Sequence, residues 1–289
     1  MLFLNSFFAV SVILLLLRSA STQMEMDEPN ENPFLYPEGA STERSDGYIY
    51  VLSDIHGNLR RFLSILNQIK LKPEDTLYIL GDCIDRHKDG IRILQMVSEM
   101  ENAVLLLGNH ELMMRDVILQ DLSDSVSEHY NEDVELWYWN GGKKTHRDFL
   151  RLPIKEQRKL ARYLQSLPVQ LDVTVNGRLF RLVHAAPIEW YPEFKDQDDY
   201  RDAVEFAVWH RFEGAYPSPA DYTIVFGHTP TEEYTDASPL RIWFHDHVID
   251  IDCGSGYPEK DDPAYPCSGN FACLRLNDMK EYYSQETGS

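Results

Sequence analysis

Apolar and polar positions alternate in a regular order after the first 46 residues. Three five-residue apolar runs predict strands, because they are short and rich in aliphatic and aromatic side chains: 48–52, 76–80 and 103–107. The segments between them, 58–70 and 91–97, place apolar residues three or four positions apart, which predicts helices that bury one face. The order β-α-β-α-β predicts a parallel sheet with right-handed crossovers.

Further strands are predicted in the second half of the chain: 169–175, 179–183 and 222–226. The first two flank Asn176-Gly177, a dipeptide typical of the turn in a β-hairpin. The last apolar runs predict a second sheet that closes the domain: 242–244, 248–251 and 271–276. Together these patterns predict an α/β fold.

Polar side chains with metal-binding chemistry follow several of these runs. They form five short motifs: Asp54-Ile55-His56-Gly57-Asn58, Gly81-Asp82-Cys83-Ile84-Asp85-Arg86, Gly108-Asn109-His110-Glu111, Val183-His184-Ala185 and Gly227-His228-Thr229-Pro230. Because open α/β sheets place their sites at the carboxyl ends of strands, we expect the five motifs to meet in space. Each motif alone is weak, since an Asp-x-His or a Gly-Asp-x-x-Asp is commonly a turn or a helix cap.

The side chains of these motifs predict a centre with two divalent metal ions. Asp54 and His56 would hold one ion together with Asp82, whose carboxylate can bridge to the second ion. The second ion would be completed by an amide and two imidazoles: Asn109, His184 and His228. Oxygen and nitrogen ligands without thiolate suit Mn, Fe or Zn, and we expect Mn. Two such ions activate a shared water and bind phosphate oxygens, which predicts phosphate ester hydrolysis.

A second group of residues suits proton transfer and phosphate binding. His110 follows the predicted ligand Asn109, so it can protonate the leaving group, and Asp85 can hold its ring. Arg86, beside them, and Arg211 are the expected phosphate contacts. The aromatic stretch 137–139 is interpreted mainly as packing rather than as a substrate platform.

The motifs resemble those of the calcineurin-like metallophosphoesterases, and most closely the phosphoprotein phosphatase (PPP) group with its bacterial and phage-type serine/threonine phosphatases. The resemblance runs over about 47–277 and includes further motifs: Trp139-Asn140-Gly141-Gly142 with Thr145, Leu167-Pro168, Trp209-His210-Arg211 and Ile249-Asp250-Ile251-Asp252-Cys253-Gly254. In the motif Gly227-His228-Thr229-Pro230, Thr229-Pro230 follows the histidine, as in the phosphatase group. A generic metallophosphoesterase has a second histidine there instead. Three positions depart from the family pattern: His87, Leu107 and Ala186.

This resemblance implies a β-sandwich flanked by helices, with the metal ligands, the proton donor His110 oriented by Asp85, and the phosphate contacts named above. It implies a metal-dependent phosphomonoesterase, a serine/threonine phosphoprotein phosphatase, acting on a phosphorylated protein or a small phosphoester. The alternative is a diadenosine tetraphosphate or nucleoside polyphosphate hydrolase, which shares the metal motifs. A non-catalytic binding protein of the same fold is a further hypothesis, and a nuclease fits less well.

The domain organisation is predicted around this site. The catalytic domain is expected over 47–279, with a helical insertion or cap over 115–165 and a flexible tail over 280–289. The region 23–46 is acidic and rich in Pro, Asn, Glu and Ser, as in a linker. Four cysteines are too few for a disulfide scaffold, and Cys83 is expected to be a buried thiol. The sequence leaves open whether two of the other three cysteines form a disulfide.

The first 22 residues resemble a secretory signal peptide. An apolar run over 7–17 precedes small residues, with cleavage expected near 20–22, and the run is shorter than the roughly 20 apolar residues of a membrane span. We expect a secreted or secretory-lumen protein, with stable membrane association only if this segment is an uncleaved anchor. The net charge of −20 makes a nucleic-acid duplex or an anionic membrane surface an unfavourable partner.

Overall fold

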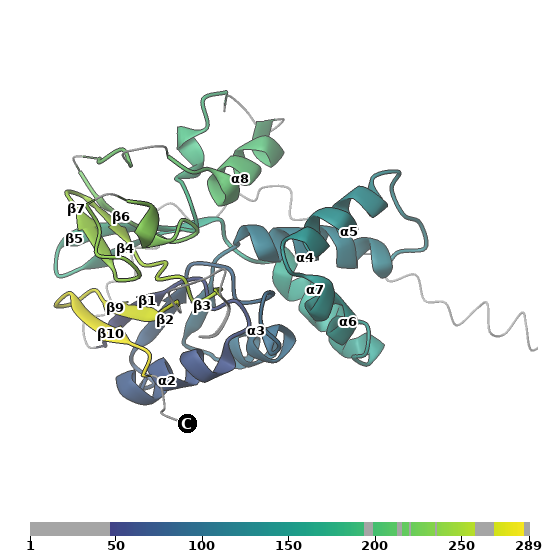
Figure 1. The fold of residues 1–289 in the computed structure, drawn as a ribbon, viewed down its shortest axis with the longest axis horizontal. Coiled ribbons are helices and arrows are strands. Elements are labelled where there is room, and N and C mark those ends of the chain that lie inside the picture. Colours follow the sequence, from purple (N-terminus) through teal and green to yellow (C-terminus); the bar gives the residue numbers. More distant parts are fainter. Residues whose placement is uncertain are drawn as a thin grey trace, which may run out of the picture. The chain divides into compact units, whose positions relative to one another are not determined.

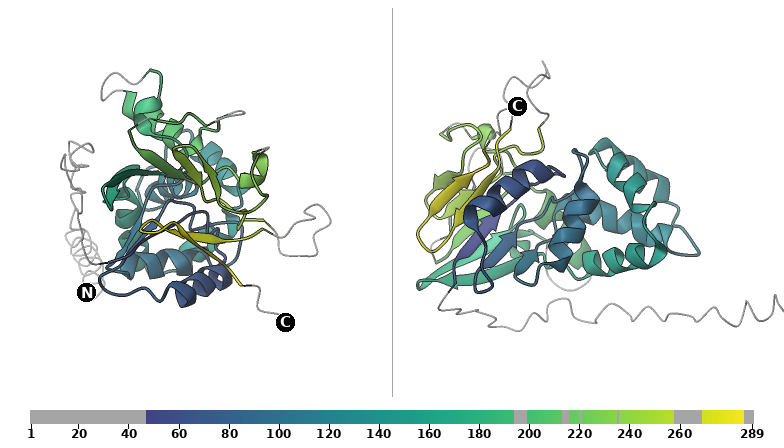
Figure 2. Two further views of the ribbon diagram at one scale, coloured as in Figure 1. Left: turned by 90° about the vertical axis from the view of Figure 1, so that its left-hand side faces the viewer. Right: turned by 90° about the horizontal axis from the view of Figure 1, so that it is seen from below.

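The computed structural model describes residues 47–193, 199–212, 216–219, 221–234, 236–257 and 269–285. Two five-stranded sheets with helices around them form this part of the chain, as the ribbon views show (Figures 1 and 2). The predicted signal peptide and the predicted acidic linker lie outside the described residues and stay predictions. Among the described helices, none is both long enough and apolar enough to cross a bilayer.

The first sheet has the strand order β10-β9-β1-β2-β3. Its strands are β1 (Ile49–Leu52), β2 (Thr76–Ile79), β3 (Ala103–Leu105), β9 (Ala272–Arg275) and β10 (Lys280–Tyr283). β1, β2 and β3 are parallel and are connected by α2 (Leu59–Ile69) and α3 (Gly90–Glu99). This confirms the predicted β-α-β-α-β unit.

Two predictions about the C-terminal part were wrong. The run 271–276 was assigned to the second sheet, but β9 pairs antiparallel with β1 in the first sheet, where Val51 faces Leu274. The tail predicted over 280–289 is a strand over its first four residues, because β10 pairs with β9 and thereby covers an edge that would otherwise be open. The last four residues of that tail lie outside the described part of the chain.

The second sheet has the order β4-β5-β6-β8-β7. Its strands are β4 (Gln170–Val175), β5 (Arg178–Val183), β6 (Thr223–Phe226), β7 (Trp243–His245) and β8 (Val248–Asp250). The expected hairpin is confirmed: β4 and β5 are antiparallel, and Asn176 and Gly177 have φ angles of 52° and 76° in the turn between them. β5, β6 and β8 are parallel.

Successive side chains along a strand point to opposite faces of the sheet, and this alternation divides the core into layers. Ile49 and Val51 face the second sheet and pack with Leu182 and Val225, whereas Leu52 and its neighbours on the opposite face pack against helices. Both faces of β1 are therefore buried, which explains why its sequence is apolar throughout.

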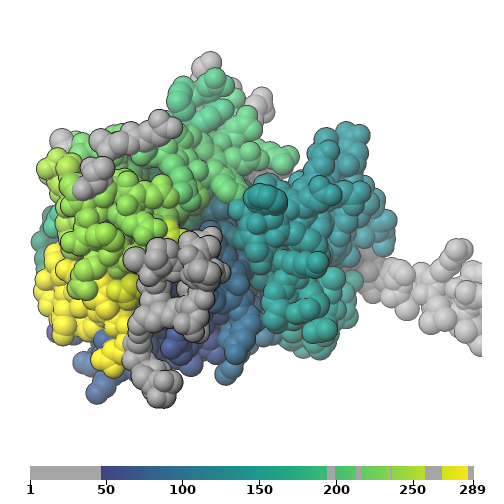
Figure 3. All heavy atoms as spheres, viewed as in Figure 1, coloured from purple at the N-terminus to yellow at the C-terminus, as the bar shows by residue number. Residues whose placement is uncertain are grey.

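The interval 115–165 is helical in the structure. It contains most of α4 (Asn109–Asp121), then α5 (Tyr130–Trp139), α6 (Lys143–Phe149) and α7 (Ile154–Gln165). α4 packs against α5 and α7, and α3 packs against α6 and α7. The later residues of this interval form the teal surface on the right of Figure 3. A further helix, α8 (Tyr200–Trp209), precedes β6 and packs against α4.

Candidate metal centre and catalytic site

The loops that follow β1, β2 and β6 carry six of the predicted site residues in an unusual backbone conformation. Among the described residues, eleven non-glycine residues have a positive φ, and six of them are predicted site residues: Asp54, His56, Asp82, Asp85, Arg86 and His228. Residues other than glycine rarely adopt a positive φ, so backbone strain is concentrated where the chemistry is predicted. Backbone hydrogen bonds from His56 to the Asp82 carbonyl (2.8 Å) and from Gly57 to the Cys83 carbonyl (2.8 Å) hold the first two loops together.

Glycines allow the loops to approach the carboxylates closely. A Cβ atom on Gly108 would lie 2.4 Å from Oδ1 of Asp82, and one on Gly227 would lie 2.3 Å from Oδ2 of Asp54. The glycines that begin the third and fifth motifs are therefore required by packing. They let the backbone N–H of the following loop reach a carboxylate, as His228 does when it donates to Asp54 Oδ2 at 3.0 Å.

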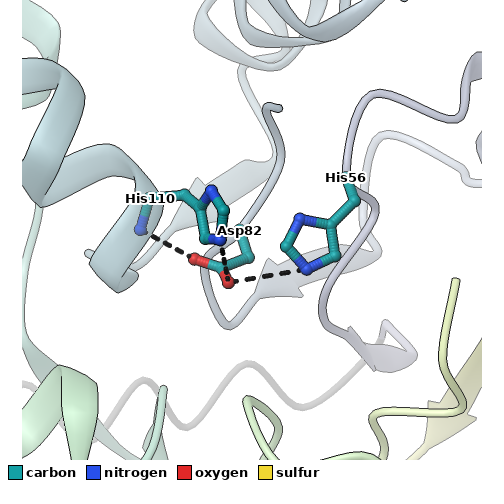
Figure 4. Close-up of side chains that lie close together, drawn as sticks. All are labelled: His56, Asp82 and His110. Atoms are coloured by element: carbon teal, nitrogen blue, oxygen red, sulfur yellow. Dashed lines mark hydrogen bonds and ion pairs between the residues drawn. The ribbon is translucent and has the colours of Figure 1, made fainter. Parts of the chain in front are cut away.

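The first predicted ligand group meets around Asp82. Nε2 of His56 lies 3.6 Å from Oδ1 of Asp54 and 3.6 Å from Oδ2 of Asp82, and all three side chains are buried. Figure 4 shows the rings of His56 and His110 as neighbours that approach the same oxygen of the Asp82 carboxylate. Burial and the nearby Arg86 charge lower the pKa of His56 to about 4, so its ring is neutral, as metal ligation requires.

The second predicted group shares the same carboxylate. Nε2 of His184 lies 3.0 Å from Oδ1 of Asn109 and 3.5 Å from Oδ1 of Asp82. Its Nδ1 lies 2.7 Å from the Leu80 carbonyl, which fixes Nδ1 as the protonated nitrogen and leaves Nε2 free to bind an ion. His228 joins Asp82 and His184 in a group of buried potential ligand atoms within 4.8 Å of one another.

These donors fit two divalent ions. Atoms that bind one ion at about 2.1 Å lie about 3–3.5 Å apart in tetrahedral or octahedral geometry, close to the separations seen here. Burial and the neighbouring His184 lower the pKa of His228 to about 3, so its ring is also neutral. Burial alone would raise the pKa of Asp54, but its hydrogen bond with His56 and the His184 charge hold that pKa below its usual range. Asp54 thus offers an ionised carboxylate to an ion, and His56 and His228 offer neutral rings.

The predicted proton donor and its partner form a buried pair beside this centre. Nδ1 of His110 lies 2.7 Å from Oδ2 of Asp85, and neither side chain is exposed. Nε2 of His110 points into the site, 3.8 Å from Oδ2 of Asp82. Burial lowers the pKa of His110, but the charges of Asp82 and Asp85 outweigh it and raise the pKa above its usual value.

Both predicted arginines lie at the site. Nη2 of Arg86 is 3.5 Å from Nε2 of His110, so its guanidinium can reach the same leaving group. Arg211 lies next to His228, with its Nε 3.4 Å from Nε2 of that ring, and its Nη1 is paired with Glu233 at 2.8 Å. The structure therefore brings the predicted site residues together, and Arg211 is held by a carboxylate outside the predicted set, that of Glu233.

Glu111 is a residue of the third motif to which sequence reasoning gave no role. Its buried carboxylate accepts the backbone N–H groups of Asp82 (2.7 Å), Cys83 (2.8 Å) and Gly108 (3.3 Å). Its position three residues after Gly108 is the spacing of a capping box, which is visible in the sequence. The contact with the loop after β2 could not be read from that spacing. Glu111 ties two ligand-bearing loops to one helix.

Replacing Glu111 by Ala is expected to lower the free energy of unfolding by about 3 kcal/mol, because three buried backbone N–H groups lose their acceptor. Urea unfolding of the metal-free protein measures this loss apart from metal binding. The matched control is Glu128→Gln, an exposed carboxylate, which should leave stability unchanged. Equal stability of Glu111→Ala and the control would contradict the tying role.

Comparison with known proteins agrees with the geometry. The model of the calcineurin-like phosphoesterase family matches residues 47–272. A serine/threonine-protein phosphatase 2 of Salmonella typhimurium is 26% identical over 243 residues, which cover 79% of this chain and 93% of the relative. A symmetrical bis(5'-nucleosyl)-tetraphosphatase of Proteus mirabilis is 32% identical over 289 residues, which cover 82% of this chain and 96% of the relative.

Solved structures show the same fold at low identity. A candidate diadenosine tetraphosphatase superposes with a TM-score of 0.53 at 16% identity, over 84% of this chain and 95% of the other. A protein serine/threonine phosphatase from Saccharomyces cerevisiae gives 0.50 at 16% identity, over 84% and 81%. The predicted arrangement of sheets flanked by helices is thereby confirmed. The chain belongs to the calcineurin-like phosphoesterase family, whose hydrolases use a binuclear divalent metal centre.

Proposed function

We propose that this chain is a serine/threonine phosphoprotein phosphatase that hydrolyses phosphomonoesters. The observation that carries the proposal is the His110–Asp85 pair, which is buried directly beside the shared carboxylate of the two candidate metal groups. A proton donor at that place can act on a leaving-group oxygen while the phosphate is held at the metal centre. The relative from Salmonella typhimurium, named as a serine/threonine-protein phosphatase, supports this substrate class.

The residues of the chain would divide the reaction as follows. Arg86 would bind the phosphate oxygens through its guanidinium, with Arg211 as a second contact once it leaves Glu233. His110 would give the proton on Nε2 to the departing oxygen, and Asp85 would hold the ring through Nδ1. Two divalent ions, Mn in our proposal, would be held by the six predicted ligands, and when bound they supply Lewis acidity and an activated water.

A second candidate function is symmetrical hydrolysis of diadenosine tetraphosphate. It is favoured by the relative from Proteus mirabilis, which is named as a bis(5'-nucleosyl)-tetraphosphatase and is matched over nearly its whole length. Both substrates present a phosphorus centre with an oxygen leaving group, so the same ligands and the same proton donor would serve either reaction. The two functions differ in what the surface around the metal centre must accommodate.

The deciding experiment supplies the Mn²⁺-loaded protein with a phosphothreonine peptide and, in parallel, with diadenosine tetraphosphate. We expect phosphate release from the peptide, measured colorimetrically, to exceed ADP formation from the dinucleotide, measured by chromatography. A chelator should abolish turnover of both. Faster formation of ADP would replace the first candidate by the second, and turnover that survives the chelator would contradict the metal-dependent mechanism.

A further inference from the structure

Asp85 accepts a second hydrogen bond that the reaction outlined above does not use. Nε1 of Trp137, at the end of α5, donates to Oδ2 of Asp85 at 2.8 Å, and the same oxygen accepts Nδ1 of His110 at 2.7 Å. Within the described part of the chain, the other oxygen, Oδ1, is buried and has no hydrogen-bond partner. The orientation of this carboxylate therefore depends on two donors at one oxygen, the imidazole and the indole.

The indole is held in place by the turn that follows α5. Trp137 is fully buried, and the backbone N–H of Gly142 donates to its carbonyl at 2.9 Å. A Cβ atom on Gly142 would lie 2.2 Å from Nε1 and Cδ1 of the indole, so only glycine leaves room for the ring. A Cβ atom on Gly141 would come within 3.2 Å of the backbone nitrogen of Arg86. The turn fits between Trp137 and the loop that carries Asp85 and Arg86.

The far side of the indole is supported by a polar chain that joins three helices. Its ring packs against His146 of α6, with the centroids 5.1 Å apart. His146 in turn lies 2.8 Å from Oδ2 of Asp121 through Nε2 and 2.9 Å from the Tyr138 hydroxyl through Nδ1. These contacts fix both the position and the direction of the indole N–H. The packing of the helical segment therefore directs this N–H at Asp85.

We propose that Trp137 is a positioning residue that holds Asp85 so that His110 presents Nε2 to the leaving group. This inference rests on the proposed function, because it assigns Trp137 to the proton transfer that His110 performs. Without the indole donor, the bond to His110 alone orients the Asp85 carboxylate, and the imidazole is held less firmly. Helix α5 thus contributes to the reaction itself, although none of its residues is a predicted metal ligand.

The variant that tests the proposal is Trp137→Phe, which keeps an aromatic ring and removes the N–H. We expect the kcat for phenyl phosphate, whose leaving group needs a proton, to fall about tenfold, the effect of one hydrogen bond to a charged group. The kcat for 2,4-dinitrophenyl phosphate, whose leaving group needs none, should change less than twofold, with metal content unchanged. Trp139→Phe is the matched control, because Trp139 is 91% exposed, and it should alter neither rate.

An equal loss on both esters, or a loss on neither, would overturn the proposal, since a structural or metal-binding defect does not depend on the leaving group. A double variant sharpens the test: in an Asp85→Asn background, Trp137→Phe should have little further effect on phenyl phosphate, whereas a full additional tenfold loss would show that the two residues act independently.

A measurement without turnover separates the contact from the proposed activity. In the ¹H–¹⁵N spectrum of the metal-free protein, the indole resonance of Trp137 should shift upon Asp85→Ala, while that of Trp139 should stay in place. An unmoved Trp137 resonance would overturn the inference even if the enzyme is a phosphatase. If the wild-type protein hydrolyses neither ester, the proposed function is overturned. The spectrum would then still report the hydrogen bond between Trp137 and Asp85, but this bond would have no role in catalysis.

Discussion

Replacing Asp82 by Asn is expected to abolish hydrolysis and to lower the metal content of the purified protein. The carboxylate lies between the two ligand groups, with Oδ2 3.6 Å from Nε2 of His56 and Oδ1 3.5 Å from Nε2 of His184. An amide keeps the volume of the side chain but removes its negative charge and replaces one oxygen by an NH₂ group, which cannot bind a metal ion. Metal ions supply several kcal/mol of transition-state stabilisation, so the loss in rate should be at least about a thousandfold.

The Asp82 test compares metal content by inductively coupled plasma mass spectrometry with turnover on the same samples. Asp124→Asn, which removes an exposed carboxylate, is the matched control and should keep both. Because Asn can still accept the N–H of His110, the loop geometry should persist, and the far-ultraviolet circular dichroism should match the wild type. Full activity together with a full complement of metal would remove Asp82 from the centre.

Replacing His110 by Asn is expected to leave the metal bound while turnover falls by about 10²–10⁴-fold, the usual contribution of a general acid. The loss should be largest for poor leaving groups such as a threonine side chain and smallest for dinitrophenolate. Geometry alone also permits a different role, because His110 can form a ligand group with His56 and Asp82. Metal content therefore decides between the roles.

The outcomes of the His110 test are distinct. Retained metal with a leaving-group-dependent loss supports proton donation, whereas lost metal would make His110 a ligand and remove it from proton transfer. An equal loss on every ester with full metal would contradict both roles. His129→Asn, which changes an exposed histidine paired with Glu132, is the matched control and should leave rate and metal unchanged.

The parts of the fold that depend on local pattern were predictable. The parallel unit of β1, β2 and β3 follows from apolar runs separated by amphipathic segments, and the β4–β5 hairpin follows from Asn176-Gly177. The partner of β9 was not predictable, because an apolar run fits either sheet, and the choice depends on which edge is open once the other strands have paired. The sequence Lys-Glu-Tyr-Tyr of β10 predicts a tail rather than a strand, because an edge strand stays partly exposed and lacks a continuous apolar run.

In the candidate site, too, features carried by local sequence were predictable and those that depend on contacts between distant segments were not. The candidate metal ligands could be named from sequence because their chemistry is carried by the side chain and its motif. The roles of Glu111 and Trp137 could not, because each acts through a contact between distant segments: Glu111 with the N–H of Asp82, and Trp137 with Asp85. Trp137 was interpreted as packing, and it does pack; its N–H direction is a property of the folded chain.

The position of β1 inside the first sheet has a consequence for how the protein is made. β1 leaves the ribosome long before β9, the strand that pairs with it, because β9 lies much later in the sequence. The first sheet therefore cannot close until β9 has emerged, and until then β1 offers the unpaired edge of an Ile-Tyr-Val-Leu strand to other nascent chains. A polypeptide truncated before β9 would contain every residue of the candidate site and still lack the strand that completes the sheet beneath it.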